Sequence, residues 1–428
     1  MPSVIVAGGG LAGLATAAAL GEAGYAVDVY EARPYPGGRA TSYALTWGDG
    51  TTAVVDNSQH ILLRCCSNLL DFYRRLGVSD AIDWHDRFYF IEPGGRTSEF
   101  RAGVLPAPAH FTESFLGLRF LSPGEKLALI RGMAALQRQF GQRTDLDSIT
   151  MAQWLTEQRQ PERVVQRFWR QVLVSAVNEE LHRMAASHGF QVIGVGFLGG
   201  PAAYHMGVPS VTLGELYRPE RWAGLPGVRF HFRRSVQSVG EGRAEVDGEE
   251  ITADAVVVAL PVDRVRAVAP FAEPPEMEFS PITGVHLWFD RPVTELPHAT
   301  VLDRTIHWVF NKGGGQQLQL TISASRAMVS MSPGAILDLC LKELSEFLPG
   351  VRRATLVRSR VIKEVKATFS ASVGLEVRRP GPQTSVPSVF VAGDWTKTGW
   401  PATMEGAVRS GYIAAEAVMG GARRFLVG

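Results

Sequence analysis

The sequence is poor in cysteine, in net charge and in long apolar runs. Its 428 residues contain three cysteines, of which Cys65 and Cys66 are adjacent; they do not make a disulfide framework and are expected to be reduced thiols. A formal net charge of +1 gives no reason to expect nucleic acid as a partner. No apolar run reaches the roughly 18 residues that a spanning helix needs, and no secretory signal is recognised at the start. No metal site is predicted.

The first segment of the chain has the pattern strand, glycine turn, helix, strand. SVIVA is a β-branched run, GGGLAG follows it, and an Ala- and Leu-rich stretch leads to YAVDVYE. Gly8, Gly10 and Gly13 form a G-x-G-x-x-G, and Glu31 ends the second strand. In this context the motif predicts a dinucleotide site. Gly8 permits the tight turn, Gly10 lets the backbone approach a pyrophosphate, and Gly13 allows the helix to pack on the strand. Glu31 would accept hydrogen bonds from a ribose.

Two further segments indicate a flavin rather than a nicotinamide. PGGR places a second glycine turn, at Gly38, and a cation, Arg39, near the same pyrophosphate. Near the other end, VFVAGDW puts Gly393 and Asp394 at the tip of a strand just before a helix. The acid can bind a ribityl hydroxyl, and the N–H groups that begin the helix, near Met404, can point at the O2 edge of a flavin.

Together these motifs resemble the FAD-binding domain of the amine oxidase and phytoene desaturase superfamily, at both ends of the chain and at ALP (259–261). The resemblance implies FAD as the cofactor, and a backbone contact to adenine at Val236. It also implies an α/β fold in which a Rossmann-like FAD-binding domain is joined to a discontinuous, mixed α+β substrate domain. The predicted cofactor-binding residues are Gly8, Gly10, Leu11, Ala12, Gly13, Glu31, Ala32, Gly38, Arg39, Gln59, Val236, Gly393, Asp394 and Met404.

The two domains are expected to interleave, because no low-complexity linker separates them. Residues 110–190 have a largely helical pattern, while 227–260 and 283–330 have strand patterns. We expect the FAD-binding domain to comprise 1–85, 206–275 and 385–428, and the substrate domain 86–205 and 276–384.

A compact polar run, Asp56 to His60, interrupts the apolar stretch VVDNSQHILL. Buried polar groups need partners or a function. The superfamily resemblance places this run at the edge of the flavin ring, with Gln59 as a cofactor contact. Asp56 and Asn57 either serve there or satisfy backbone groups in a turn. His60 is either functional or a satisfied core histidine.

The amino-acid sequences of three segments point to a narrower family than the fold does. DNSQHILL followed by CC, FWRQVLVSAVN (168–178) and GDWTKTGWPATMEGAVRSG (393–411) resemble the hydroxysqualene dehydroxylases of bacterial hopanoid synthesis. Arg64 departs from that branch, where a small residue is expected; the cation either alters the local geometry or points to solvent.

The resemblance to that branch implies FAD-dependent reduction of the allylic alcohol hydroxysqualene to squalene. The departing hydroxide needs an acid, and we expect His60 to supply the proton, since its ordinary pKa is suitable. Asp56 would orient or charge the imidazole. Phe168, Trp169, Phe190 and Phe197 either line an apolar pocket or fill the core, and Trp395 and Trp400 either wall the flavin or only pack beside it.

A long isoprenoid substrate implies contact with a membrane. The segment HFTESFLGLRFLSPGEKLALIRGM is either an interfacial anchor or an amphipathic stretch against the core. Its relevant side chains are Phe111, Phe115, Leu116, Leu118, Phe120 and Leu121, with Arg119, Lys126 and Arg131. We expect a cytoplasmic protein that is peripheral on the inner membrane face and possible association with the other squalene-synthesis enzymes.

A second G-x-G-x-x-G, from Gly194 to Gly199, lacks a following helix and acid and is interpreted as a flexible apolar segment. The sequence therefore shows no site of its own for a nicotinamide electron donor. Three alternatives remain: a carotenoid desaturase, an amine oxidase, and a prenyl-lipid-binding protein without flavin. Glu31, Arg39 and Asp394 argue against the last.

Overall fold

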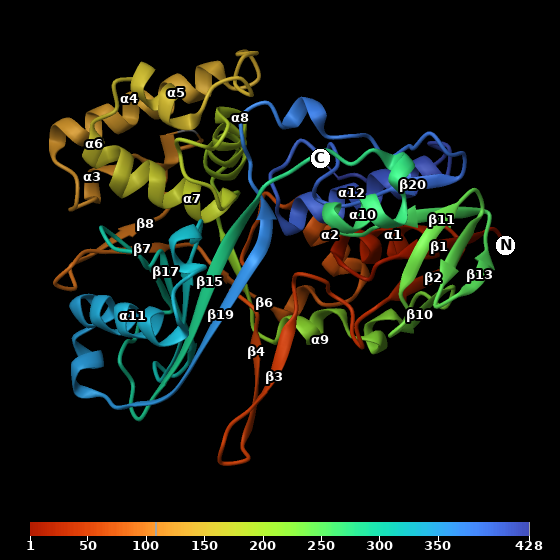
Figure 1. Cartoon of the computed structure of the whole chain (residues 1–428). Coiled ribbons are helices and arrows are strands. Elements are labelled where there is room, and N and C mark those ends of the chain that lie inside the picture. Colours follow the sequence, from red (N-terminus) through yellow and green to blue (C-terminus); the bar gives the residue numbers. More distant parts are fainter. Residues whose placement is uncertain (108, 428) are drawn as a thin grey trace.

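A five-stranded parallel sheet forms one half of the molecule (Figure 1). The structure is a computed structural model that describes residues 1–107 and 109–427. The strand order is β10-β2-β1-β14-β20, and every neighbouring pair is parallel. The strands are β1 (Ser3–Ala7), β2 (Ala26–Glu31), β10 (Val228–Phe232), β14 (Ala255–Val258) and β20 (Val389–Val391). Because the strands are parallel, their carboxyl ends meet at one edge, where ligands bind in such sheets.

Two helices cover one face of this sheet. α1 (Leu11–Glu22) is rich in alanine and packs closely against α12 (Met404–Val418), so the first and last helices of the chain are neighbours. Every residue of α1 from Leu11 to Leu20 is buried, which explains why this helix is apolar all round instead of amphipathic. A small antiparallel sheet lies beside the parallel sheet. It is made of β11 (Val236–Gly240), β12 (Arg243–Val246) and β13 (Glu249–Thr252).

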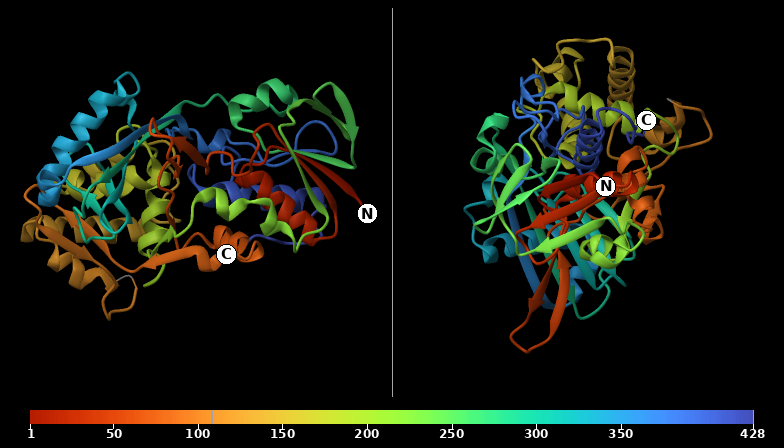
Figure 2. Two further views of the ribbon diagram at one scale, coloured as in Figure 1. Left: turned by 90° about the horizontal axis from the view of Figure 1, so that it is seen from below. Right: turned by 90° about the vertical axis from the view of Figure 1, so that its right-hand side faces the viewer.

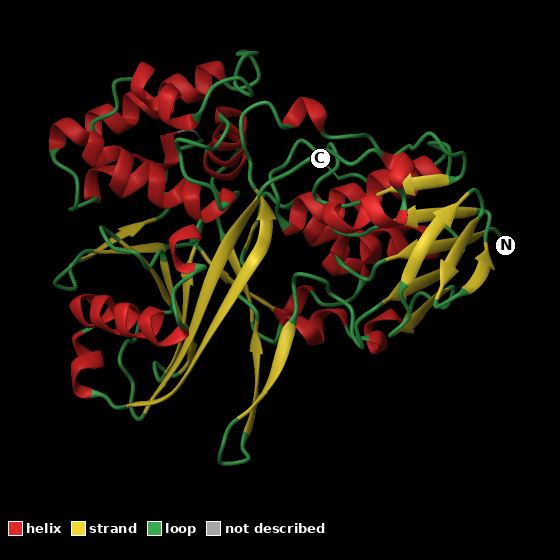
Figure 3. Cartoon of the chain, in the orientation of Figure 1, coloured by secondary structure: helices red, strands yellow, loops and turns green. Residues whose placement is uncertain are grey.

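A seven-stranded mixed sheet forms the other half, in the order β19-β15-β18-β17-β16-β7-β8. Its long strands β15 and β19 run back toward the parallel sheet (Figure 3). One face packs on α11 (Pro333–Phe347) and the other on helices of the middle segment. The strands are β7 (Phe88–Ile91), β8 (Thr97–Phe100), β15 (Phe279–Phe289), β16 (His298–Val301), β17 (Trp308–Gly313), β18 (Gln317–Ile322) and β19 (Leu356–Phe369).

Short helices between 112 and 197 form a cap at the end of the molecule away from the parallel sheet (Figure 2). They are α3 (Thr112–Gly117), α4 (Pro123–Gln139), α5 (Met151–Glu157), α6 (Glu162–Val164), α7 (Gln171–Val177) and α8 (Ala186–Gln191). The wider turns Val165–Arg170 and Val192–Phe197, with i→i+5 bonding, precede α7 and follow α8. α4 begins as its sequence predicts, with Pro123 in the first turn and a capping box between Ser122 and Glu125.

The interpretation of 194–199 as a flexible segment is wrong. Gly194 and Gly196 lie in the buried helical turn Val192–Phe197 that continues α8. Periodicity did not show this, because glycine is a poor helix former and the turn has no polar face.

The remaining elements connect the two halves. They are β3 (Ser42–Thr46), β4 (Thr52–Asp56), β5 (Leu62–Leu63), α2 (Ser67–Arg75), β6 (Ile82–His85), β9 (Met206–Pro209), α9 (Leu213–Tyr217) and α10 (Val262–Val268), with single 3₁₀ turns between them. None of the helices in the described residues is both long enough and apolar enough to cross a membrane.

Candidate active site

The first glycine turn has the geometry that a dinucleotide requires. Gly8 has φ +108°, and a Cβ on Gly13 would lie 2.0 Å from the Gly8 carbonyl oxygen. Only glycine therefore allows α1 to start so close to β1, as the motif predicts. α1 has no side-chain cap, so its first N–H groups remain available to a phosphate.

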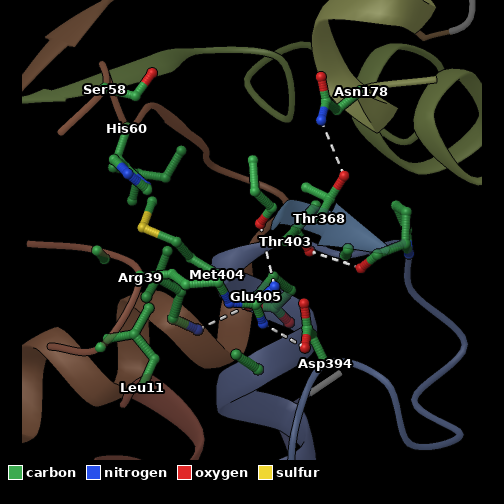
Figure 4. A pocket seen from close by; sticks show the side chains of 18 of the residues that line it. Leu11, Arg39, Ser58, His60, Asn178, Thr368, Asp394, Thr403, Met404 and Glu405 are labelled. Carbon is green, nitrogen blue, oxygen red and sulfur yellow. Dashed lines mark hydrogen bonds and ion pairs between the residues drawn. The ribbon is translucent and has the colours of Figure 1, made fainter. Parts of the chain in front are cut away.

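The second glycine turn packs directly on the first. A Cβ on Gly38 would lie 2.8 Å from the Cα of Gly10. Arg39, which follows, donates from Nη2 to Oδ1 of Asp394 at 2.6 Å and from Nη1 to the Ala367 carbonyl at 3.1 Å. Figure 4 shows this pair beside the start of α12. The structure thus brings together two charged groups that lie 355 residues apart in the chain.

The ribose and adenine end lies along β2 and β11. Glu31 accepts hydrogen bonds from the backbone N–H groups of Gly9 and Arg33, each at 2.8 Å. This fixes the carboxylate at the turn and leaves lone pairs that can accept hydroxyl protons. Val236 and Ala32 line the same cavity.

A buried arginine that the sequence did not single out holds the C-terminal loop. The Arg379 side chain is fully buried and donates to the carbonyls of Asp394 and Trp400 at 2.8 Å each, and to Oγ1 of Thr398 at 2.9 Å. Its guanidinium also lies over the ring of Phe369. The loop that carries Asp394 is therefore set by one side chain outside it.

A single cavity of about 630 Å³ joins these groups to the middle of the molecule. It is lined by every predicted cofactor-binding residue except Gly13, whose place is the helix–strand contact. The glycine cradle, the free start of α1, the carboxylate at the end of β2 and the Arg39–Asp394 pair all suit a dinucleotide. The lining of the cavity continues beyond the groups that suit a dinucleotide.

Aromatic side chains that contact one another form the aromatic section of this cavity: Phe88, Phe90, Phe100, Phe168, Phe197 and Trp308. Of the four aromatic residues predicted as lining or core, Phe168 and Phe197 line the cavity, whereas Trp169 and Phe190 are buried in the core away from it. Trp400 lines the cavity. Trp395 does not line the cavity. It is buried in the core and its Nε1 donates to the Leu260 carbonyl at 3.1 Å.

The expected partnership of Asp56 with His60 is wrong. The Asp56 carboxylate accepts from Oγ of Ser42 at 2.8 Å and from the backbone N–H of Leu213 at 3.0 Å. Asp56 ends β4, where alternation turns its side chain away from the cavity. Its burial raises its pKa, and its role is to join β4 to α9.

His60 does line the cavity, but the expectation that its ordinary pKa suits an acid is also wrong. Burial, together with the positive charge of Arg39, lowers the pKa of His60 to about 4. The imidazole is therefore neutral at pH 7. Its Nε2 lies 3.1 Å from Oδ1 of Asn57. Because Asn57 Nδ2 donates to the Arg39 carbonyl at 2.8 Å, Oδ1 is an acceptor and Nε2 carries the proton.

The rest of the polar run is held by two charged residues. Nζ of Lys312 donates to Oε1 of Gln59 at 3.2 Å. Oε1 of Glu364 accepts from the hydroxyl of Tyr43 at 3.0 Å and from Nδ2 of Asn57 at 3.3 Å. Gln59, Asn57 and Glu364 all line the cavity.

Arg64 does not reach the site. Its guanidinium lies over the ring of Trp84, 4.0 Å from the centroid, and it does not line the cavity. The departure from the expected small residue is accommodated by a cation–π contact.

The strand order and these groups define a dinucleotide-dependent oxidoreductase with an apolar substrate chamber. A family model described as flavin containing amine oxidoreductase matches residues 11–419, so the chain belongs to that family and FAD is its cofactor. It is 28% identical to the hydroxysqualene dehydroxylase of Rhodopseudomonas palustris, over 98% of this chain and 99% of that protein. It is 25% identical to the 15-cis-phytoene desaturase of Synechococcus elongatus, over 97% and 95%.

Solved structures show the same fold. An oxidoreductase from Methanosarcina mazei superposes with a TM-score of 0.70 at 18% identity, covering 98% of this chain and all of that one. The prediction of an α/β, Rossmann-like FAD-binding fold of the amine oxidase and phytoene desaturase type is confirmed.

Sequence reasoning missed Arg379, Glu364 and Tyr43. Arg379 precedes a Pro-Gly-Pro stretch, and Glu364 stands among charged residues of a long strand. Both have the pattern of solvent-exposed positions. Only Arg379, which stands next to a proline-rich turn just before the VFVAGDW strand, had a signal that could have been noticed.

We expect Arg379→Met to weaken FAD binding about tenfold, because the carbonyls of Asp394 and Trp400 lose their donor and the loop loosens. The measurement is FAD titration of the apoprotein followed by flavin fluorescence. Arg378→Met, at the exposed neighbour, is the matched control and should bind FAD as the wild type does. Equal FAD affinity in both variants would contradict the positioning role.

Proposed function

We propose that the protein reduces hydroxysqualene to squalene. The observation that supports this most is the aromatic section of the cavity, which opens from the FAD site and contains no charged side chain. The acids that line the cavity are Glu31, Glu364, Asp394 and Glu405. The Glu405 carboxylate accepts hydrogen bonds from Nδ2 of Asn68 and from the Leu69 N–H at the start of α2. A long uncharged ligand fits such walls.

This chamber argues against amine oxidation. A protonated amine would need a carboxylate to pair with, the aromatic section contains none, and burying the amine unpaired is costly. A polyene desaturase remains the second candidate, because the same apolar walls accept a hydrocarbon and the phytoene desaturase of Synechococcus elongatus is about as similar as the dehydroxylase.

Replacing an allylic C–O bond by C–H consumes two electrons and two protons and releases water. FAD, when bound and reduced, would supply both electrons and one of the protons as hydride, and the second proton goes to the departing oxygen to form water. The aromatic section excludes bulk water, which would otherwise return an allylic cation to the alcohol. His60 is neutral, with Nε2–H directed to Asn57, and its Nδ1 lone pair is left to accept a hydrogen bond in the cavity.

His60→Gln should retain most of the activity, while His60→Ala should lose about 100-fold, since glutamine can still hydrogen-bond without being charged. The measurement is kcat/KM between pH 5 and 8. With a pKa near 4, the wild type should show no loss of rate through pH 6.5 that depends on His60. Such a loss, abolished in His60→Gln, would restore the imidazolium as the acid.

Anaerobic single turnover tests the proposed reaction. The purified protein's flavin is reduced, hydroxysqualene is added, and the return of oxidised-flavin absorbance is followed while the lipid is identified by mass spectrometry. Squalene in an amount equal to the flavin oxidised is the expected result. No reoxidation with a bound, competent flavin would contradict the dehydroxylase, and desaturation of phytoene by the oxidised protein would then be measured.

We also propose that the protein works at a membrane surface, since its substrate is a long-chain isoprenoid. The anchor differs from the one expected from sequence: Phe111, Phe115, Leu118, Phe120 and Leu121 are buried, and of the six only Leu116 is exposed. The candidate anchor instead combines Leu116 with Leu127 and Ile130 of α4. Lys126 joins them, donating to the Leu116 carbonyl at 2.5 Å.

Three features support this anchor. Leu116 and Leu127 are 64% and 53% exposed, and the exposed Arg119 and Arg131 flank them, which suits an anionic lipid surface. Phe111 and Phe115, on the inner side of the same segment, pack on Phe100 of the chamber. A cytoplasmic position on the inner membrane face, beside other enzymes of squalene synthesis, follows from this proposal.

The double variant Leu116→Ser/Leu127→Ser should bind vesicles of phosphatidylcholine and phosphatidylglycerol at least about tenfold more weakly, because two inserted side chains are lost. Co-sedimentation measures this. Val357→Ser/Val365→Ser, at comparably exposed positions of β19 (57% and 49%), is the control. Equal binding by the two double variants would place the anchor elsewhere.

A further inference from the structure

Three polar side chains of one helical stretch face the otherwise apolar chamber. Gln171, Ser175 and Asn178 line the cavity, and their spacing of four and three residues puts them on one face of α7. The i→i+5 turn Val165–Arg170 directly before Gln171 is a feature often found at functional positions. Polar groups in an aromatic wall need partners.

Two of the three are satisfied within the protein. Nδ2 of Asn178 donates to the Ser280 carbonyl at 3.0 Å and to Oγ1 of Thr368 at 2.9 Å, and its Oδ1 accepts from the Ala324 N–H at 2.6 Å. Figure 4 shows the Asn178–Thr368 bond at the edge of the pocket. Oγ of Ser175 donates to the Gln171 carbonyl at 2.7 Å. These groups hold the helix in place.

Gln171 is satisfied only on its nitrogen. Nε2 donates to the His307 carbonyl at 2.9 Å and to Oγ1 of Thr300, whose own hydroxyl donates to the same carbonyl at 3.2 Å. A carbonyl can only accept, so the orientation of the amide is determined. Oε1 has no donor among residues 1–107 and 109–427, although Gln171 is 96% buried.

We propose that Oε1 of Gln171 is a recognition site for the hydroxyl of an isoprenoid alcohol in the aromatic section. A hydroxyl donates one hydrogen bond to this acceptor, while its hydrocarbon chain contacts Phe168 and Trp308. A pure hydrocarbon that fills the cavity beside this oxygen offers it no donor, which disfavours the hydrocarbon relative to an alcohol. The inference rests on the proposed function for its substrate class, and it favours an alcohol over a polyene.

Binding of farnesol and farnesene, an isoprenoid alcohol and a hydrocarbon of the same carbon number, tests this site. The holoprotein is titrated with each by calorimetry in the same detergent micelles. The wild type should prefer the alcohol. Gln171→Leu, of similar size but without the acceptor, should lower the alcohol-to-hydrocarbon affinity ratio at least about tenfold. Farnesene should bind as tightly as before or more tightly.

Gln166→Leu is the matched control, since Gln166 is exposed on the same helical stretch and bonds to Glu162; its ratio should equal that of the wild type. A ratio unchanged in Gln171→Leu, or no preference in the wild type, would overturn the inference. If Gln171→Leu does not retain FAD, Gln171→Met, an unbranched side chain that also lacks the acceptor, decides on the same criterion.

Binding and turnover separate the two proposals. A wild type that prefers farnesol through Gln171 but does not convert hydroxysqualene overturns the dehydroxylase and leaves the alcohol site. Squalene formation with an unchanged ratio in Gln171→Leu overturns the alcohol site alone.

Discussion

The contact between the end of β1 and the start of α1 is the constraint on which the rest of the site depends. With no Cβ on Gly13, the helix begins against the Gly8 carbonyl, and this leaves its unpaired N–H groups at the carboxyl edge of the sheet. The second glycine turn then stacks on the first at Gly10. Everything else that meets FAD is placed relative to this cradle, because parallel strands deliver their ends to the same edge.

Charge is distributed unevenly along the cavity that starts there. The nucleotide part is lined by Arg33, Arg39, Arg234 and Arg264, which suits a pyrophosphate. The aromatic section has no charged side chain, and burial beside Arg39 keeps His60 neutral. The two sections require opposite environments, and the polar run from Asn57 to His60 lies where they meet. One short segment therefore lines the cavity where the two sections meet.

Partners from other parts of the chain hold this junction in place. Arg379 reaches the loop of Asp394, Glu364 of β19 holds Asn57, and Lys312 holds Gln59. Each contact joins the seven-stranded sheet, or the segment that follows it, to the FAD half. A substrate bound in the chamber is thus positioned by both halves, although the chain passes between them several times.

How much could be predicted depended on how local the signal was. The G-x-G-x-x-G turn, Glu31 and the PGGR turn are read from neighbouring residues, and the structure places them as expected. Asp56 and His60 were assigned by adjacency, but alternation along β4 sends Asp56 to Ser42, and burial changes the pKa of His60. The apolar residues near Phe111 suited a membrane anchor by composition, yet five of the six are buried, with Phe111 and Phe115 packed on Phe100.

The class of cofactor can be predicted from the chain alone, because backbone shape at glycines and a terminal acid are properties of short segments. The tertiary structure decided the partners of the buried polar groups. Whether Asp56 or Gln171 faces a neighbour or the chamber depends on residues more than a hundred positions away. Their protonation and free hydrogen-bonding atoms follow from burial, which no short segment specifies.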